Sequence, residues 1–183
     1  MALTSTVYHF EVRLSDVDRG VYETLSFKAA RHPSETAENL AVRSLAYCLE
    51  FTEGLSFSRG ISEPDEPALA ARDLTGVLQA WIDTGSPDAA RLHRASKAAP
   101  RVAVYTHKPP DALLKSLEGE KIHRADKLEL YAFEPGFIDD FVRRMERRTS
   151  FDLSVTAGHL YLTVGGETLS GAVTRLALPA VSG

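Results

Sequence analysis

An acidic residue ends a strongly patterned apolar segment that runs from Val77 to Asp83. In an extended strand, the side chains at 78, 80 and 82 point one way and those at 77, 79, 81 and 83 point the other. Most of both sets is apolar, so the segment is predicted to be a central strand that is covered on both faces. Asp83 comes just before a predicted helix start, at the position where open α/β sheets bind their ligands.

Two further acids, Asp65 and Glu66, are expected near Asp83. A turn centred on Asp73-Leu74-Thr75-Gly76 would fold residues 66–72 back as an antiparallel partner and bring both acids roughly opposite Asp83. Acids crowded in this way repel unless a cation or protons intervene, and oxygen ligands without paired cysteines or histidines favour Mg²⁺ over Zn²⁺. The alternative is that Asp65 and Glu66 form a solvated loop and Asp83 caps the next helix.

A helix is predicted from Ser34, its expected N-cap, to about Phe51. Its apolar stripe, followed back towards the N-terminus, reaches Glu38 and Glu35, so both acids extend the face that is expected to be buried. Acids in a first turn also complement the helix dipole, and that explanation needs no ligand.

Basic residues lie on the predicted helix 87–98 and just before the predicted helix 34–51. Arg91, Arg94 and Lys97 share one flank of a helix predicted from 87 to 98, with Ser86 as its N-cap. They could place a cation near the acids or a phosphate, or form a solvated basic face. Arg31 and His32 precede the first helix, where they could bind an anion or organise the turn.

Composition sets the class of protein. The chain has 183 residues, 44% hydrophobic and 25% charged, which fits one soluble globular domain over residues 1–183. The net charge of −4 argues against a broadly basic surface for nucleic acid. The single cysteine, Cys48, excludes an intramolecular disulfide, and the absence of an apolar span or signal peptide favours a cytoplasmic protein without a membrane segment.

The order of elements predicts a mixed α+β fold. Strands are expected at 4–14, 21–30, 55–61, 66–72, 77–83, 101–107, 127–133, 150–156, 159–164 and 169–178, and helices at 34–51, 87–98, 111–117 and 135–145. The sequence carries no P-loop, G-x-G-x-x-G, HExxH or CxxC motif, which excludes the common nucleotide, zinc-protease and thiol-redox sites.

Over nearly its whole length, the chain resembles the bacterial YaeQ family. The resemblance is carried by the stretches Ala30-Arg31-His32-Pro33-Ser34-Glu35-Thr36, Arg59-Gly60, Asp65-Glu66-Pro67, Asp73-Leu74-Thr75-Gly76, Trp81-Ile82-Asp83-x-Gly85-x-Pro87-Asp88 and Val102-x-Val104-Tyr105. It implies a fold similar to the PD-(D/E)XK restriction-endonuclease-like core, with additional N- and C-terminal strands.

The resemblance also implies a set of catalytic residues. In nucleases of that fold, a helix glutamate and two strand acids hold Mg²⁺, which polarises the phosphate and activates water. Here Glu38 matches the glutamate, Asp65 or else Asp73 the first strand acid, and Asp83 the second. Gly85 stands where those enzymes have a lysine, so Lys97, Arg94 or Arg91 would have to replace it, although an arginine transfers protons poorly.

Two functions are therefore expected from the sequence. One is a divergent Mg²⁺-dependent phosphodiesterase that uses Glu38, Asp65 and Asp83 with a basic residue from helix 87–98. The other is a non-catalytic module that retains the fold and recognises nucleic acid or a protein through the same cleft. In either case Arg31, His32 and Tyr105 are candidates to line the cleft, and the alternative for all three is ordinary packing.

Overall fold

The computed structural model describes residues 4–58 and 65–178, and it confirms the mixed α+β class. The chain forms two compact units, each built from two separate segments. Unit 1 contains Met1–Leu49 and Phe133–Thr174, and unit 2 contains Glu50–Ala132 and Arg175–Gly183. The expectation of a single domain stays a prediction.

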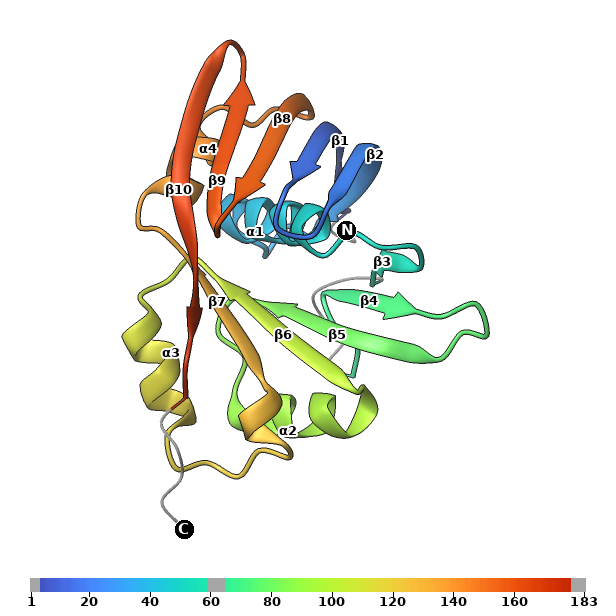
Figure 1. The fold of residues 1–183 in the computed structure, drawn as a ribbon, viewed down its shortest axis with the longest axis vertical. Coiled ribbons are helices and arrows are strands. Elements are labelled where there is room, and N and C mark those ends of the chain that lie inside the picture. The colour runs from blue at the N-terminus through green and yellow to red at the C-terminus, as the bar shows by residue number, and fades with distance from the viewer. Residues whose placement is uncertain (1–3, 59–64, 179–183) are drawn as a thin grey trace. The chain divides into compact units, whose positions relative to one another are not determined.

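Unit 1 contains a five-stranded sheet with two helices (Figure 1). Its strands lie in the order β2-β1-β8-β9-β10, with β1 and β8 parallel and the other neighbours antiparallel. Its elements are β1 (Thr6–Asp16), β2 (Val21–Arg31), α1 (Ala37–Leu49), α4 (Phe137–Val142), β8 (Arg148–Thr156), β9 (His159–Val164) and β10 (Glu167–Leu176), whose last two residues belong to unit 2.

The core of unit 1 lies on one face of this sheet, because its strands alternate strictly. Phe10, Val12 and Leu14 of β1 are buried, whereas the residues between them are open to solvent or only half-buried. Phe10 stacks on Phe27 with ring centroids 5.4 Å apart. The helix α1 packs against this apolar face, and its own buried stripe completes the core.

Unit 2 contains a mixed sheet in the order β7-β6-β5-β4-β3. The strands β3, β4 and β5 pair antiparallel, whereas β5, β6 and β7 are parallel and are joined through helices. Its elements are β3 (Leu55–Phe57), β4 (Leu69–Arg72), β5 (Leu78–Thr84), α2 (Ala89–Ala98), β6 (Arg101–Thr106), α3 (Pro110–Leu117), the short 3₁₀ helix η1 (Ala125–Lys127) and β7 (Glu129–Phe133).

The core of unit 2 lies between its sheet and the helices α2 and α3. Trp81 of β5 and Val104 of β6 pack there against Leu92 of α2 and Leu113 of α3. The strand β5 lies between β4 and β6, and Asp83 near its end is 2% exposed. The prediction of a buried central strand that ends in a carboxylate is therefore confirmed.

Several predicted boundaries change. The helix predicted from Pro135 to Met145 is only α4, because the chain turns at Gly136 with a φ of 86°. The first helix begins at Ala37, and its first-turn amide, on Asn39, donates to Thr36 Oγ1, so Thr36 rather than Ser34 provides the cap. The predicted strand 55–61 is seen as Leu55–Phe57, and its residues 59–61 lie outside the described residues, as does the motif Arg59-Gly60.

None of the helices in residues 4–58 and 65–178 combines the length and the apolar character that crossing a lipid bilayer would demand.

Candidate functional site

The carboxylate of Asp83 forms a two-point ion pair with the guanidinium of Arg91. Arg91 Nε donates to Asp83 Oδ2 at 2.7 Å, and Arg91 Nη2 donates to Asp83 Oδ1 at 3.0 Å. The side chain of Asp83 is 3% exposed and that of Arg91 is 23% exposed. The backbone N–H of Ala68 also donates to Oδ1, at 3.3 Å. Both oxygens of the predicted catalytic acid are therefore engaged by groups of unit 2.

Arg91 is held by more than its ion pair. Its Nη2 also donates to the backbone carbonyl of Glu66 at 2.6 Å, and its guanidinium carbon lies 5.4 Å from the centre of the Trp81 ring. The hydrogen bond to Asp83 is the main reason that the pKa of Arg91 rises above its ordinary value. Arg91 thus links three parts of unit 2: the end of β5, the segment before β4 that contains Glu66, and the start of α2.

The start of α2 explains why Arg91, rather than its neighbours, meets the acid. Asp88 is the N-cap and accepts a hydrogen bond from the backbone N–H of Arg91 at 2.8 Å, so the expectation of a cap at Ser86 is wrong. Arg91 therefore sits in the first helical turn, beside the end of β5. Arg94 and Lys97 lie farther along α2, and both are exposed.

The strand register places the acidic pair differently from the prediction. Leu69 pairs with Ile82, so Ala68 rather than Asp65 or Glu66 lies opposite Asp83. Two features shift the register. The turn is longer than predicted, because the backbone N–H of Asp73 donates to the carbonyl of Val77, and a β-bulge lies next to it, between Ala71 and Arg72.

Asp65 forms no ion pair with Arg91 in the described part of the chain. It is exposed, and its negative charge contributes to the raised pKa of Arg91.

The third predicted metal ligand, Glu38, belongs to unit 1, whereas Asp65 and Asp83 belong to unit 2. Glu38 is half-buried in the first turn of α1. Its neighbour Glu35 is the buried acid of this region, and Arg43 Nε and Nη2 donate to its two oxygens at 2.7 Å. Within residues 4–58 and 65–178, no three acidic, histidine or cysteine side chains gather as a metal-binding group. The assignment of Glu38, Asp65 and Asp83 as Mg²⁺ ligands therefore stays a prediction.

The predicted binding residues Arg31 and His32 organise the turn before α1. Arg31 Nε donates to the carbonyl of Glu35 at 3.0 Å, and its Nη1 donates to Tyr8 Oη at 3.4 Å. His32 Nδ1 lies 2.7 Å from Ser34 Oγ and accepts the Ser34 backbone N–H at 3.1 Å. These contacts match the turn role that the sequence left open for both residues.

Asp73 closes the β4–β5 turn on itself. Its Oδ1 accepts from Thr75 Oγ1 at 2.6 Å and from the backbone N–H groups of Thr75 and Val77, both at 2.9 Å. Hydrogen bonds, led by that from the Thr75 side chain, lower the pKa of Asp73. This residue therefore fixes the hairpin whose second strand carries Asp83.

Tyr105 belongs to a polar ladder that runs across the sheet of unit 2, and the sequence did not predict this ladder. Its five members are Glu50, Arg101, Tyr105, Glu129 and Tyr131. Arg101 donates to both oxygens of Glu50, at 2.7 and 2.9 Å, and to both oxygens of Glu129, at 2.7 and 3.1 Å. Tyr105 Oη donates to Glu50 at 2.7 Å, Tyr131 Oη donates to Glu129 at 2.6 Å, and the two rings stack at 4.9 Å. Each carboxylate is thus shared between one arginine and one tyrosine.

The ladder predicts a loss of stability in alkali. Burial, followed by the hydrogen bond to Glu129, raises the pKa of Tyr131 from 10.0 to about 12. Between these two pH values the folded chain keeps a proton that the unfolded chain has lost, so the free energy of unfolding should fall as pH rises from 10 to 12. Urea titrations across this range, with tyrosinate absorbance recorded in parallel, measure the slope.

Two tyrosine variants test whether Tyr131 causes this dependence of the free energy of unfolding on pH. Tyr131→Phe should make it shallower, whereas Tyr22→Phe, which changes a 62% exposed tyrosine, should preserve it. An unchanged slope in Tyr131→Phe would remove Tyr131 as its source.

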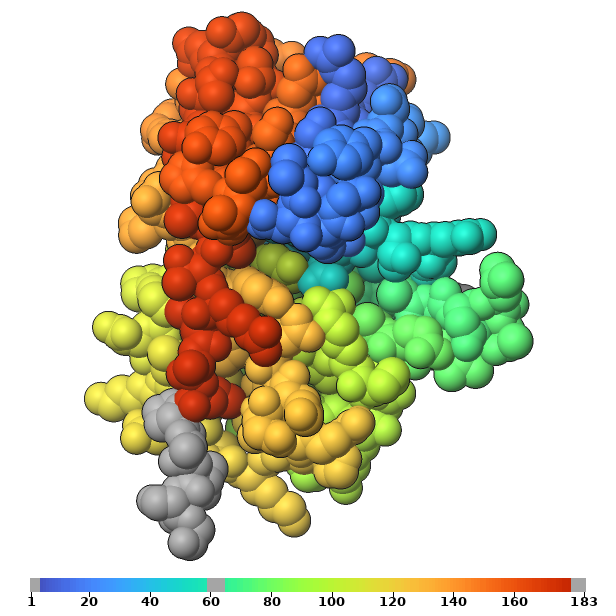
Figure 2. Space-filling view, viewed as in Figure 1, coloured from blue at the N-terminus to red at the C-terminus, as the bar shows by residue number. Residues whose placement is uncertain are grey.

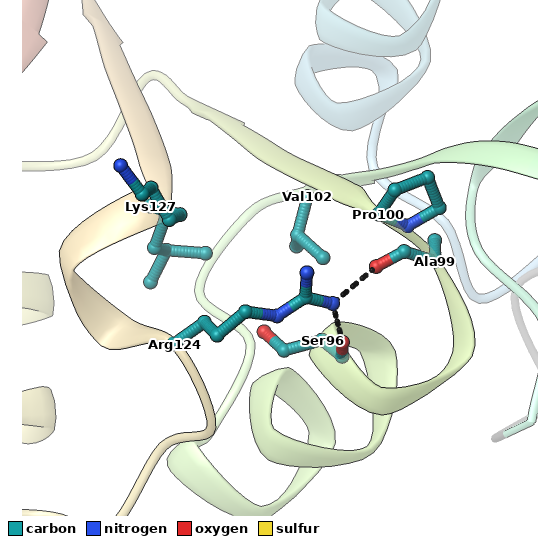
Figure 3. Close-up of a pocket in the computed structure, with 7 residues that line it drawn as sticks. Ser96, Ala99, Pro100, Val102, Arg124 and Lys127 are labelled. Atoms are coloured by element: carbon teal, nitrogen blue, oxygen red, sulfur yellow. Dashed lines mark hydrogen bonds between the residues drawn. The ribbon is translucent and has the colours of Figure 1, made fainter.

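A small pocket at the C-terminal end of α2 is closed by Arg124 (Figure 3). Arg124 Nη2 donates to the carbonyls of Ser96 at 2.7 Å and Ala99 at 3.3 Å, the two bonds that are dashed in the figure. The pocket has a volume of about 10 Å³, which leaves room for about one water molecule. Arg124 therefore satisfies the last carbonyls of a helix rather than lining a ligand site.

Comparison with solved structures agrees with this fold. The crystal structure of the YaeQ protein from Pseudomonas syringae superposes with a TM-score of 0.85 at 32% identity, and it covers 94% of this chain and 96% of that one. The YaeQ protein from Xanthomonas axonopodis pv. citri gives a TM-score of 0.83 at 30% identity and covers 96% of this chain and 100% of that one.

Sequence comparison gives the same family. The Escherichia coli K12 protein YaeQ is 38% identical over 107 residues, which span 58% of this chain and 59% of that protein. The Salmonella typhi protein YaeQ is 28% identical over 180 residues, which span 98% and 99% of the two chains. The family model described as "YaeQ protein" matches residues 1–173. Together with the matching crystal structures, this near-complete match establishes that the chain belongs to the YaeQ family.

Proposed function

We propose that this chain is a non-catalytic binding module, and that its resemblance to PD-(D/E)XK nucleases is one of architecture. The observation that carries the proposal is the ion pair of Asp83 with Arg91. In the nuclease mechanism this carboxylate binds Mg²⁺. Here its two oxygens accept hydrogen bonds at 2.7 and 3.0 Å from a guanidinium, which stays protonated at all physiological pH values.

The electrostatic cost of placing a metal beside Arg91 supports this proposal. Two unit charges 4 Å apart repel by about 4 kcal/mol at an effective dielectric constant of 20, so a divalent ion next to a guanidinium would meet about twice that repulsion. Mg²⁺ also requires near-octahedral oxygen ligands, whereas Arg91 already takes the Glu66 carbonyl at 2.6 Å. A metal at Asp83 would therefore have to displace Arg91 from three partners: Asp83, Glu66 and the Trp81 ring.

One observation favours the Mg²⁺-dependent phosphodiesterase as a second candidate. The negative charge of Asp83 and, to a smaller extent, that of Asp65 both act on the guanidinium of Arg91. If Arg91 moved onto a substrate phosphate, Asp83 would lose its cation and could bind a metal ion. Arg91 would then be the basic group that replaces the lysine missing at Gly85.

Titration with metal, combined with cleavage assays, separates the two functions. We expect no saturable heat on titrating the protein with Mg²⁺ or Mn²⁺ up to millimolar concentration, and no cleavage of single-stranded DNA, duplex DNA or RNA. Saturable metal binding that disappears in Asp83→Asn, together with metal-dependent cleavage that disappears with it, would establish the enzyme instead.

The structural role of Asp83 predicts a separate effect on stability. Asp83→Asn should lower the free energy of unfolding by about 2–4 kcal/mol, because Arg91 loses the charge of its buried partner. Urea unfolding followed by the fluorescence of Trp81, the single tryptophan, measures this change within unit 2. Adding Arg91→Gln should restore part of the loss, whereas Arg94→Gln, at an exposed position of the same helix, should change stability by less than about 0.5 kcal/mol. An Asp83→Asn variant as stable as the wild type would contradict this role.

A further inference from the structure

The sheet of unit 1 has an open face opposite α1. We call it the open face and define it by the alternate residues of β1, β2, β8, β9 and β10 that do not enter the core. On β1 these are His9, Glu11, Arg13 and Ser15, all of which are exposed or half-buried. In Figure 2 the front of unit 1 is formed by β1 and β2, in blue, and by β8 to β10, in orange and red, with no helix over them.

One end of the open face carries a row of basic side chains. In the strand register His9 lies directly opposite Lys28 of β2 and directly opposite Arg148 of β8, so the three side chains stand side by side on one face. We call them the cationic row. In the described part of the chain, neither Lys28 nor Arg148 has a carboxylate within salt-bridge distance.

Elsewhere on the open face, by contrast, a basic side chain is paired with an acid. Arg13, two rows farther along, lies opposite Asp152 and forms a two-point ion pair with it at 2.7 and 2.8 Å. Lys28 and Arg148 lie on either side of His9, so a charged His9 would face two like charges across the strands, which destabilises a sheet. Consistently, partial burial lowers the pKa of His9, and the positive charges of Arg148, Lys28 and Arg147 lower it further. An external anion would relieve this repulsion.

The other end of the open face presents aromatic rings. Tyr22 of β2 and Tyr161 of β9 are 62% and 46% exposed, and they belong to the same row, Tyr22-Ser15-Ser154-Tyr161. The ring of His159 lies 5.0 Å from that of Tyr161. Along β1 the aromatic row, at Ser15, lies six residue steps from the cationic row, at His9, a distance of roughly 20 Å at the usual rise per residue.

Cations at one end of a sheet face and exposed aromatic rings at the other are the two elements with which proteins hold single-stranded nucleic acid. The cations contact phosphates, and the bases stack on the rings without a need for specific sequence. The distance between the two rows is long enough for several nucleotides. Between the two rows, the open face carries hydroxyl side chains, including those of Ser26, Ser150 and Thr163, and hydroxyl groups hydrogen-bond readily to phosphate and sugar.

We propose that the open face of unit 1 binds single-stranded nucleic acid, with its phosphates on the cationic row and its bases on Tyr22 and Tyr161. This inference rests on the proposed function, binding without cleavage, and names its ligand and surface. The acid Glu11 lies next to the cationic row on β1, so it repels phosphate and keeps the affinity moderate. Replacing it should therefore strengthen binding.

Fluorescence anisotropy with a labelled single-stranded oligonucleotide, titrated at several salt concentrations, tests the proposal. The double variant Lys28→Ser/Arg148→Ser should bind about tenfold more weakly and should flatten the dependence of log affinity on log salt by about 1.4, since each phosphate contact on a single strand contributes about 0.7. Tyr22→Ala and Tyr161→Ala should each weaken binding about tenfold. Glu11→Gln should tighten it. The matched control Lys115→Ser/Lys121→Ser removes two exposed cations from unit 2 and should leave binding unchanged.

The other outcomes overturn the inference in distinguishable ways. Binding that is insensitive to Lys28→Ser/Arg148→Ser would place the nucleic acid elsewhere and leave the proposed function standing. Preference for a duplex of the same length, for polyglutamate or for anionic vesicles would reject single-stranded nucleic acid as the ligand. Cleavage of the labelled strand in Mg²⁺ would instead overturn the proposed function. Circular dichroism of each variant confirms that it is folded before binding is compared.

Discussion

Replacing Arg43 with methionine is expected to lower the free energy of unfolding by about 3–5 kcal/mol. Arg43 is 6% exposed, and the carboxylate with which it pairs, on Glu35, is 1% exposed. Arg43 also donates to the carbonyl of Ala30 at 2.8 Å. Methionine fills much of the same volume but leaves the buried Glu35 without its cation, and an uncompensated buried charge is the expensive part of a broken ion pair.

Far-ultraviolet circular dichroism during urea unfolding measures this effect, because it follows the strands and helices of unit 1, whereas the single tryptophan, Trp81, lies in unit 2. The matched control is Arg13→Met. Arg13 forms an ion pair of similar geometry with Asp152, but the two side chains are 76% and 45% exposed, so its loss should cost far less stability than the loss of Arg43. Adding Glu35→Leu to Arg43→Met should recover most of the stability. Equal effects at Arg43 and Arg13 would contradict the role of burial.

Replacing Arg101 with methionine is expected to destabilise unit 2 by about 2–4 kcal/mol. Arg101 separates the carboxylates of Glu50 and Glu129, whose side chains are 8% and 18% exposed. Without it, two acids repel across the sheet, although Glu50 keeps its hydrogen bond from Tyr105 and Glu129 keeps its hydrogen bond from Tyr131. Arg101 itself is 37% exposed, so solvent moderates the loss compared with a fully buried pair.

The pH dependence of this effect tests its electrostatic origin. Burial alone would raise the pKa of Glu129, but hydrogen bonds from Arg101 and Tyr131 outweigh it and lower that pKa below 4.5. The stabilisation is therefore present above pH 4.5 and is lost as pH falls through the lowered pKa of the folded state. The difference in free energy of unfolding between the wild type and Arg101→Met, measured by Trp81 fluorescence in urea, should become smaller in acid. Arg94→Met on α2 is the control and should unfold with the same free energy as the wild type. A loss of stability in Arg101→Met that does not change with pH would indicate lost packing rather than lost charge.

Local patterns were enough to predict most elements of the fold. The alternation in β1, β2 and β5 and the apolar stripe of α1 gave their positions to within a few residues, because each pattern depends on neighbours in sequence. The caps were less predictable. Asp88 and Thr36 compete with Ser86 and Ser34 for the same role, and aspartate, threonine and serine are all good caps.

The site itself required tertiary information. The helical spacing places Arg91, Arg94 and Lys97 on one flank, but only the position of the α2 cap decides that Arg91 meets Asp83. The apolar stripe of α1 indicated that Glu35 is buried, but Glu35 precedes the helix, so no helical spacing could reveal Arg43 as its partner.

The polar ladder was not predictable for the same reason. Glu50 and Arg101 are distant in sequence, and their contact depends on the pairing of β6 with β7 and on the path of the chain after α1. Alternation does place Arg101 and Tyr105 on one face of β6, and Glu129 and Tyr131 on one face of β7, and these are the local signals of the ladder.

The pairing of β1 with β8 has a consequence for how the protein is made. His9 and Arg148 lie side by side in unit 1, although most of unit 2 is encoded between them. During synthesis at the ribosome, the first hairpin and α1 must wait until all of that intervening chain has emerged before their sheet can be completed. Proteins with such distant pairings have a high contact order and fold slowly. Until then, the side of β1 that pairs with β8 in the folded protein has no strand beside it, and such unpaired strand edges favour wrong pairing in the nascent chain.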